Sequence, residues 1–228
     1  MGYLVIGLFL LVNGLFLWVF KGGYNIPDSG FASLEPFFSL APWVFLFLIP
    51  AITMKSFSEE IRQGTIELLL TRPLTSWQLI LGKYFGALVL VVFSLLPTLL
   101  YVMAVSELSQ DEGSVDSGVI IGSYFGLLFL GGCYAAIGVF ASLLSPNQIV
   151  SFIVGVFLCF MAYFGFQAMA ELNLLGDLGN SLAEFGISAH YKSISRGVID
   201  TRDLIYFLSM ITFFLVLTKW SLTSKKAA

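Results

Sequence analysis

Four long stretches of this sequence contain no charged side chain, and they constrain the fold more than any other feature. They cover residues 1–20, 36–54, 84–106 and 117–170. The hydrocarbon core of a bilayer is about 30 Å thick, so a helix that crosses it needs roughly 20 apolar residues. The first three stretches fit one crossing each, whereas the fourth is too long for one helix. Pro146, inside the polar segment 145–148, divides it into two.

A sixth crossing is predicted near the C-terminus. Residues 204–218 are uncharged, Lys219 can extend toward the interface, and Trp220 is suited to lie in it. The six predicted spans are residues 3–20, 37–54, 79–105, 118–144, 149–170 and 204–222. We therefore predict an all-α polytopic membrane protein, with one transmembrane domain over residues 1–222.

Composition supports this class and excludes several others. Apolar residues make up 58% of the chain and charged residues 11%, against about 45–50% and about 25% in soluble domains. This excludes a soluble enzyme or a disordered tail, and the net charge of −3 argues against nucleic acid as a partner. Solidly apolar runs such as 89–93 lack the alternation of a membrane β-barrel. The lipid bilayer is the expected surrounding.

The distribution of basic residues predicts the orientation. Seven of the 11 basic residues lie after the uncharged stretch 36–54 and before residue 84, or after the uncharged stretch 204–218: Lys55, Arg62, Arg72, Lys83, Lys219, Lys225 and Lys226. Cytoplasmic loops of membrane proteins carry an excess of Lys and Arg. We therefore expect both termini, the segment 55–78 and the tail 223–228 to be cytoplasmic.

The segment 55–78 is predicted to begin with an amphipathic helix. Ser56 and Glu59 have the spacing of a capping box, which indicates a new helix start. Its less polar face would carry Phe57, Ile61, Thr65 and Leu68. Such a helix could link a cytosolic partner to the membrane domain, or it could simply anchor the loop at the interface.

The end of this segment carries two further signals. The pair Arg72-Pro73 is predicted to stop the amphipathic helix, because proline cannot continue it. Thr75 and Gln78 have the spacing of a second capping box, for the third membrane helix.

Residues 59–70, together with Pro73 and the pair Gly82-Lys83, resemble the signature of type-two ABC transporter permeases. Within that family the sequence is most similar to the permease components of bacterial gliding-motility ABC transporters. The residues that carry this closer resemblance are 2–7, 13–20, 41–48 and 195–203. The resemblance implies a multi-pass permease of the bacterial inner membrane, exporting cargo when a separate ATPase subunit hydrolyses ATP.

The resemblance also implies partners and a docking region. The resemblance implies that the segment 55–78 is the coupling region that docks on a cytosolic ABC ATPase subunit. Pro73 would fix the turn that follows the helix. The implied docking residues are Glu59, Glu60, Arg62, Gly64, Thr65, Glu67, Arg72 and Pro73. A second permease half, in a homodimer or heterodimer, and a gliding-motility auxiliary membrane subunit are the other implied partners. The resemblance leads us to expect that Glu67→Lys blocks docking.

Family members usually carry a basic cytosolic helix before the first span, which helps to form the groove for the ATPase. This sequence begins almost inside the first predicted span. We expect coupling to depend on whether such a helix precedes it.

The sequence offers no catalytic constellation, metal site or cofactor motif. Its single histidine, His190, lies in a polar loop, and no predicted span has an ionised residue at mid-membrane. No phosphate-binding loop motif is present. We expect no enzymatic activity in this chain, so uphill transport would draw its energy from another polypeptide.

Residues 171–203 are predicted to form a loop on the outer side. Leu172, Leu175, Leu178, Leu182 and Phe185 recur at helical spacing and indicate an outer interfacial helix. The family resemblance implies a gate there, whereas the plainer alternative is a surface-bound loop. The candidate gate residues are Arg196, Asp200, Arg202 and Asp203, of which Arg196 and Asp200 could form an ion pair.

Two motifs of small residues predict close helix contacts. They are Gly82 with Gly86 and Gly122 with Gly126, and packing within one subunit is favoured over dimerisation. Two functions remain open for the chain: an ABC permease subunit, or a non-transporting membrane scaffold of a cell-envelope machine.

Overall fold

The computed structural model describes residues 2–66, 75–108, 116–171 and 184–227. Every regular element in these ranges is helical. Six of the helical stretches are long and apolar enough to cross a membrane. The prediction of an all-α membrane protein with six spans is therefore confirmed.

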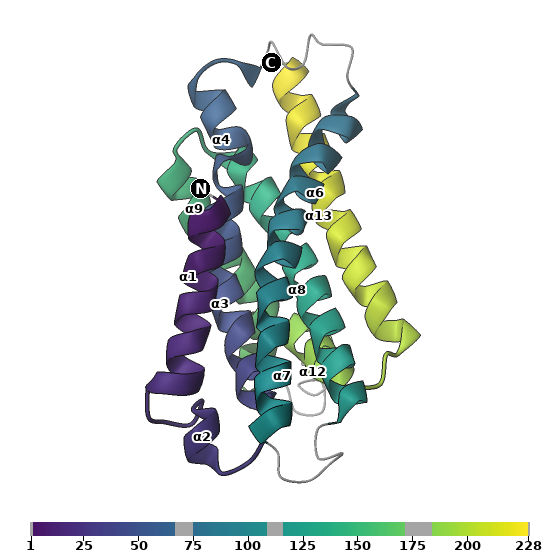
Figure 1. Ribbon diagram of the computed structural model, residues 1–228. Coiled ribbons are helices and arrows are strands. Elements are labelled where there is room, and N and C mark those ends of the chain that lie inside the picture. The colour runs from purple at the N-terminus through teal and green to yellow at the C-terminus, as the bar shows by residue number, and fades with distance from the viewer. Residues whose placement is uncertain (1, 67–74, 109–115, 172–183, 228) are drawn as a thin grey trace.

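The candidate spans are built from consecutive helical elements (Figure 1). Their bounds are α1 (Gly2–Gly14) with η1 (Leu15–Val19); α3 (Glu35–Thr53) with α4 (Lys55–Arg62); α6 (Ser76–Leu95), η2 (Leu96–Thr98) and α7 (Leu99–Leu108); α8 (Ser117–Leu144); α9 (Gln148–Phe160), η3 (Met161–Gly165) and α10 (Phe166–Glu171); and α13 (Thr201–Ala227). Two short helices, α2 (Ile26–Ser29) and α12 (Ile187–Ile194), lie between spans.

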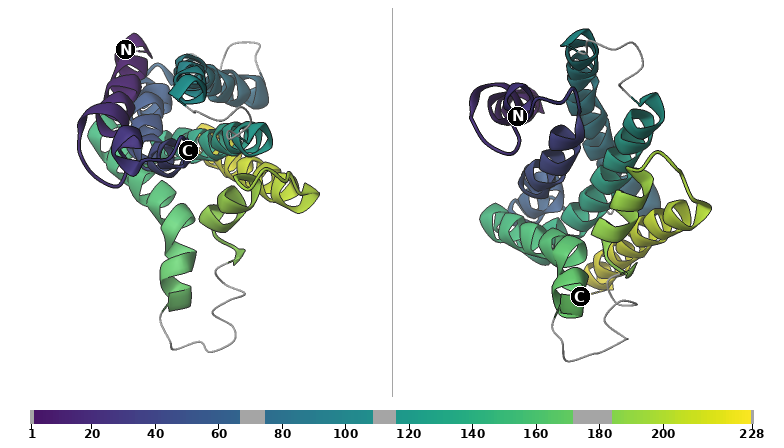
Figure 2. Two further views of the ribbon diagram at one scale, coloured as in Figure 1. Left: turned by 60° about the horizontal axis from the view of Figure 1, so that its bottom comes forward. Right: turned by 90° about the horizontal axis from the view of Figure 1, so that it is seen from below.

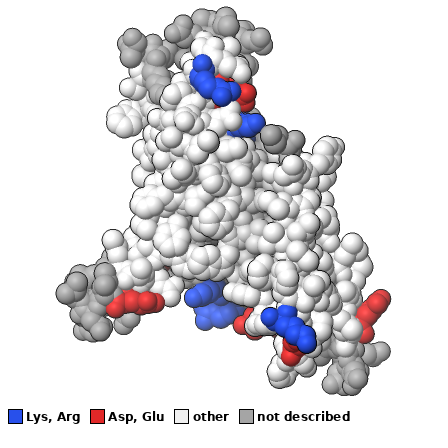
Figure 3. Space-filling model, turned by 90° about the vertical axis from the view of Figure 1, so that its left-hand side faces the viewer, with Lys and Arg blue, Asp and Glu red and all other residues white. Residues whose placement is uncertain are grey.

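The bundle has two distinct ends (Figure 1). Helix α4 and both chain termini lie at one end, which we call the α4 end. Helices α2, α7 and α12 lie at the opposite end, which we call the α12 end. The side view in Figure 3 shows charged residues at these two ends and an uncharged belt between them. That distribution suits a protein surrounded by hydrocarbon along its middle.

Helix α8 forms the centre of the bundle (Figure 2). It contacts α3, α4, α6, α9, α12 and α13. In its most apolar part 78% of the residues are buried, against 17% in the first and last spans. Glycines allow this close packing. A Cβ atom built on Gly138 would lie 2.0 Å from Oγ1 of Thr53 in α3.

Several spans contain prolines or turns that depart from regular α-helix. Pro97 lies in η2, between α6 and α7, and Pro42 and Pro50 lie inside α3. Proline supplies no backbone N–H and disrupts the helical hydrogen bonding. The π-helical turns η1 and η3 interrupt the first and fifth spans, and π-helical turns often mark functional positions.

Helix α12 belongs to the segment 171–203 that was predicted as an outer loop. It packs against α8, α13 and η3 at the α12 end of the bundle. Its residues Ile187, Ser188, Tyr191 and Ile194 are buried, and the Tyr191 hydroxyl donates a 2.6 Å hydrogen bond to the carbonyl of Phe38. Most of the predicted interfacial helix, residues 172–183, lies outside the described residues. Phe185 is exposed in a turn.

The two predicted small-residue motifs behave differently. Gly122 and Gly126 pack inside the chain, where added Cβ atoms would lie 2.7 Å from the Ile194 carbonyl and 3.2 Å from the Tyr191 ring. Gly82 and Gly86 face open space, with no atom within 4 Å of an added Cβ. Within the described residues, packing inside the subunit therefore holds for the α8 motif only.

Candidate functional site

Helix α4 continues from α3 after a single residue, Met54. The Met54 backbone is itself α-helical, and its N–H donates to the Pro50 carbonyl at 2.8 Å. The predicted capping box of Ser56 and Glu59 is therefore wrong: Ser56 lies inside α4, and no side chain caps that helix. The physical reason is that a capping residue serves free N–H groups, and here the preceding helix already supplies carbonyl acceptors.

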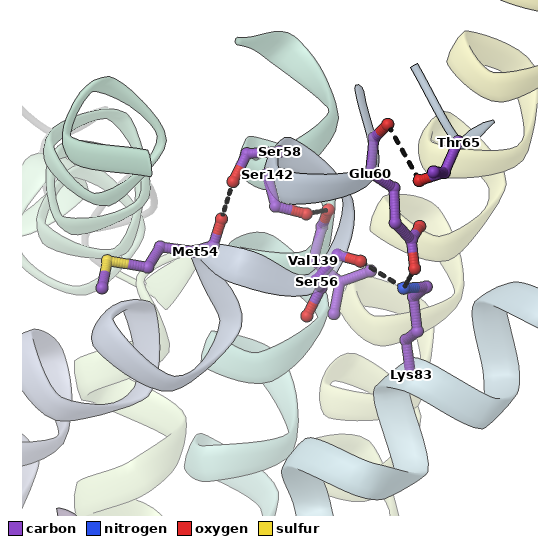
Figure 4. Close-up of polar contacts among 8 residues, drawn as sticks. All are labelled: Met54, Ser56, Ser58, Glu60, Thr65, Lys83, Val139 and Ser142. Carbon is purple, nitrogen blue, oxygen red and sulfur yellow. Dashed lines mark hydrogen bonds and ion pairs between the residues drawn. The ribbon is translucent and has the colours of Figure 1, made fainter. Parts of the chain in front are cut away.

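Lys83 of α6 ties the third span to α4 (Figure 4). Its ammonium group lies 2.5 Å from Oε1 of Glu60 and also donates to the carbonyl of Ser56. The same nitrogen lies 4.6 Å from the centre of the Phe57 ring. The Lys83 side chain is 19% exposed and that of Glu60 is 24% exposed, so this ion pair is less screened by water than a surface pair.

The other carboxylate oxygen of Glu60 is left without a partner. Oε2 is buried, and among the described residues no hydrogen bond reaches it. An unpaired oxygen in such a position costs free energy. Lys83 offsets this cost by neutralising the carboxylate, which makes Glu60 depend on α6.

One face of α4 is anchored in the bundle. Phe57 and Ser58 are fully buried, and the Ser58 hydroxyl donates to the carbonyl of Met54 one turn earlier. Next to it, in α8, the Ser142 hydroxyl donates to the Val139 carbonyl at 2.6 Å (Figure 4). Helix α4 thus contacts α8 as well as α3 and α9.

The opposite face of α4 is polar and open. Arg62 and Glu59 form a 3.8 Å ion pair with side chains 58% and 38% exposed, and Gln63 is exposed beside them. A pair of this kind contributes only about 0–1 kcal/mol to stability. These charges are consequently accessible to another molecule.

Helix α4 ends in a Schellman motif. The N–H of Thr65 donates to the Glu60 carbonyl at 3.0 Å, and the N–H of Gly64 donates to the Ile61 carbonyl at 3.2 Å. Gly64 has φ +68°, a left-handed conformation that favours glycine. The Thr65 hydroxyl also donates to the Glu60 carbonyl at 3.3 Å. This turn fixes where the chain leaves α4.

The structure brings part of the predicted docking set together. Glu59, Arg62 and Gly64 are at or near the surface, Thr65 is half-buried, and Glu60 points inward to Lys83. The remaining three predicted residues, Glu67, Arg72 and Pro73, lie outside the described residues. Lys83 has no individual role among the predicted docking residues, although a lone cation at the start of an apolar span indicates a buried ion pair.

The second predicted capping box is confirmed. The N–H of Gln78 donates to the Thr75 hydroxyl at 3.3 Å, and the N–H of Thr75 donates to the Gln78 side chain at 2.9 Å. Thr75 has an extended backbone, so α6 starts here and needs its first N–H groups satisfied. This start sets the position of Lys83 two turns further on.

The predicted gate residues separate into distinct roles. Asp203 is buried and its Oδ1 lies 2.6 Å from Nδ1 of His190, which stacks on Tyr206 with ring centres 3.8 Å apart. Asp200 accepts a 2.9 Å hydrogen bond from the N–H of Arg202 at the start of α13. Arg196 and Arg202 are exposed.

Arg196 and Asp200 do not pair in the described part of the chain. The spacing of four residues assumed a helix, but residues 195–197 form a turn and 198–200 have no regular structure. No cluster of three or more His, Cys, Asp or Glu side chains that could hold a metal occurs among the described residues.

Comparison with known proteins identifies a family for this arrangement. The model of a family described as ABC-2 family transporter protein matches residues 21–226. A search of the curated proteins found no match.

Proposed function

Since this chain belongs to the family of ABC-2 transporter proteins, we propose that the exposed face of α4 receives the cytosolic ATPase subunit. Membership makes the chain a membrane permease subunit of an ABC transporter, which works with an ABC ATPase and a membrane-spanning partner. In this proposal ATP hydrolysis is the task of the separate subunit, and the chain itself has no catalytic role.

The double attachment of α4 is the observation that carries this proposal. Helix α4 follows α3 through the helical residue Met54, and Lys83 connects it to α6 through Glu60 and Ser56. A push on α4 is therefore passed to two membrane spans. Its Glu59, Arg62 and Gln63 face outward, as a docking surface requires.

The energetic demand on this connection is moderate. Shifting a two-state equilibrium from 1:99 to 99:1 takes about 5.5 kcal/mol of differential binding. The Lys83–Glu60 pair is mostly buried, and breaking a buried pair from one side costs about 3–5 kcal/mol. Loss of either Lys83 or Glu60 would therefore weaken the attachment of α4 to α6.

Orientation and cellular role complete the proposal. The basic residues around α4 favour a cytoplasmic location for that end and for both termini. The family resemblance favours the bacterial inner membrane. Residues 2–7, 13–20, 41–48 and 195–203 carry the resemblance to permease components of gliding-motility transporters. We propose that role, with a homodimeric or heterodimeric second half and an auxiliary membrane subunit of the gliding machinery.

Charge reversal on α4 tests the docking surface. We would tag the C-terminus, purify Glu59→Lys/Arg62→Glu from native membranes in mild detergent, and quantify the co-purified ATPase by mass spectrometry. We expect at least a tenfold loss of ATPase per copy, since charge-assisted contacts are each worth about 1.5–3 kcal/mol. Arg202→Glu, an exposed arginine at the α12 end, is the matched control and should keep normal ATPase recovery.

The alternative function is a non-transporting scaffold in a cell-envelope machine. It predicts co-purification of envelope proteins without an ATPase in the unmodified chain, and that result would refute the docking proposal. Equal ATPase recovery in the charge-reversal variant and the control would refute the assignment of α4 as the docking surface.

A further inference from the structure

A large cavity lies at the α12 end, away from the α4 site. Its volume is about 810 Å³, within the range of about 300–1,000 Å³ that is usual for ligand sites. Residues of α3, α8, η3, α10 and α12 line it. Figure 2, right, looks onto this end of the bundle, where α3, α8 and α12 lie near one another.

The cavity extends from the end of a span into membrane depth. Both Glu35, at the start of α3, and Trp43 line it. These two residues are eight positions apart, about 12 Å along a helix. The polar layer of a bilayer leaflet is about 5–8 Å thick, so with Glu35 placed within that layer Trp43 falls at the level of the hydrocarbon.

The deep part of the cavity has aromatic walls. The Trp43 and Phe164 rings are 4.4 Å apart between centres, and the Tyr163 and Phe164 rings 4.5 Å. Trp43 is 42% exposed, although it belongs to a membrane span. An aromatic wall open to the hydrocarbon layer fits an acyl chain better than a water-soluble ligand.

The rim of the cavity carries charges of both signs. Lys192 and Arg196 line it and are exposed, and neither forms an ion pair within the described ranges. The Glu35 carboxylate is likewise exposed at the rim and unpaired among described residues. Asp116 differs, because its carboxylate caps α8 by accepting from the N–H groups of Gly118 and Val119.

Two buried hydroxyl groups add hydrogen-bonding capacity inside. Tyr163 is 7% exposed and Ser188 is 3% exposed, and both line the cavity. Neither hydroxyl has a hydrogen-bond partner in the described part of the chain, and neither oxygen is fully enclosed. Both oxygens are open to the cavity and are therefore available to hydrogen-bond a polar group of an occupant.

We propose that this cavity binds a glycerophospholipid with a phosphate–ammonium headgroup, of the phosphatidylethanolamine type, from the leaflet at the α12 end. Lys192 and Arg196 hold the phosphate, Glu35 receives the ammonium group, and an acyl chain lies along Trp43 and Phe164. This lipid site is separate from the α4 docking surface and does not depend on the coupling role.

Native mass spectrometry of the full chain in mild detergent tests the lipid site, with phosphatidylethanolamine of defined chain length as the probe. We expect lipid retention on the unmodified protein and about tenfold weaker retention on Lys192→Gln/Arg196→Gln, because charge-assisted hydrogen bonds are lost. Arg202→Gln removes an exposed cation outside the cavity and should retain lipid normally.

A steric variant separates the cavity from surface charge. Ser39 is exposed and lines the cavity, so Ser39→Trp should fold and reduce lipid retention to a similar extent. Ser209→Trp, at an exposed serine of α13 outside the cavity, is its control. ATPase co-purification should be unchanged in Ser39→Trp, which keeps this test independent of docking.

The source of the ligand is tested by competition. Free phosphoethanolamine should not displace the lipid, because it lacks the chain that contacts the aromatic wall. Displacement by the free headgroup would overturn the lipid assignment in favour of a soluble ligand. Unchanged lipid retention in both the charge and the steric variants would overturn the site itself.

Discussion

Lys83 and Glu60 are 23 residues apart in the sequence, and their charged groups meet at 2.5 Å. Lys83 also bonds the backbone of Ser56, so it holds α4 through both a side chain and the main chain. The consequence is mechanical. These contacts attach α4 to α6, although the bonded residues are far apart in the sequence.

Breaking this pair should destabilise the protein more than breaking a surface pair. We expect Lys83→Met to lower the free energy of unfolding by about 2–4 kcal/mol, because it leaves the Glu60 carboxylate mostly buried and unpaired. In the double variant Lys83→Met/Glu60→Leu, the loss of unfolding free energy should be smaller than the sum of the losses in Lys83→Met and Glu60→Leu. Denaturant titration in detergent micelles measures both.

The exposed pair of Arg62 and Glu59 on α4 supplies the control for this comparison of single and double variants. Arg62→Gln removes the partner of Glu59 and should change the free energy of unfolding by no more than about 1 kcal/mol. Strict additivity of the Lys83 and Glu60 effects would contradict the interpretation of a coupled ion pair.

Gly138→Ala should disturb the contact between α8 and α3. The added Cβ would lie 2.0 Å from Oγ1 of Thr53, and overpacking of this kind costs about 1–3 kcal/mol. Thr53→Ala removes the clashing hydroxyl, so the double variant should recover part of the loss. Gly7→Ala is the control, since no atom lies within 4 Å of its added Cβ, and its melting temperature should not fall.

Removing His190 should destabilise the protein, because the buried Asp203 carboxylate loses its partner. Asp203 has a side chain only 6% exposed, and its second oxygen is buried without a partner in the described part of the chain. His190→Ala is therefore expected to destabilise the protein by about 1–3 kcal/mol. His190→Ala/Asp203→Asn should lose less than the sum of the single variants. Lys21→Ala, an exposed site, should have no effect on the same thermal melt.

Thr75→Ala should loosen the first turn of α6. The substitution leaves the N–H of Gln78 without its 3.3 Å acceptor, and losing such a cap costs about 1 kcal/mol. Amide hydrogen exchange near Gln78 should accelerate, while Thr75→Ser keeps the hydroxyl and should exchange as the unmodified protein does. Equal exchange in both variants would refute a stabilising role for the cap.

The two predicted capping boxes show how far local sequence reasoning reaches. Both have a hydroxyl residue followed three positions later by a Glu or Gln. At Thr75 the backbone is extended before the helix, so free N–H groups exist and the box forms. At Ser56 the preceding helix continues through Met54, so no free N–H group needs it. The motif is the same, and only its three-dimensional context differs.

The four long uncharged stretches predicted five membrane helices, because a chain in hydrocarbon must pair its backbone groups internally. The sixth followed from the shorter run 204–218 together with Lys219 and Trp220. These runs could not predict which faces of those helices meet. A face against lipid and a face against another helix use the same apolar residues. The meeting of Lys83 with Glu60, the fit of Gly138 against Thr53 and the burial of α12 beside Gly122 were therefore decided by tertiary packing alone.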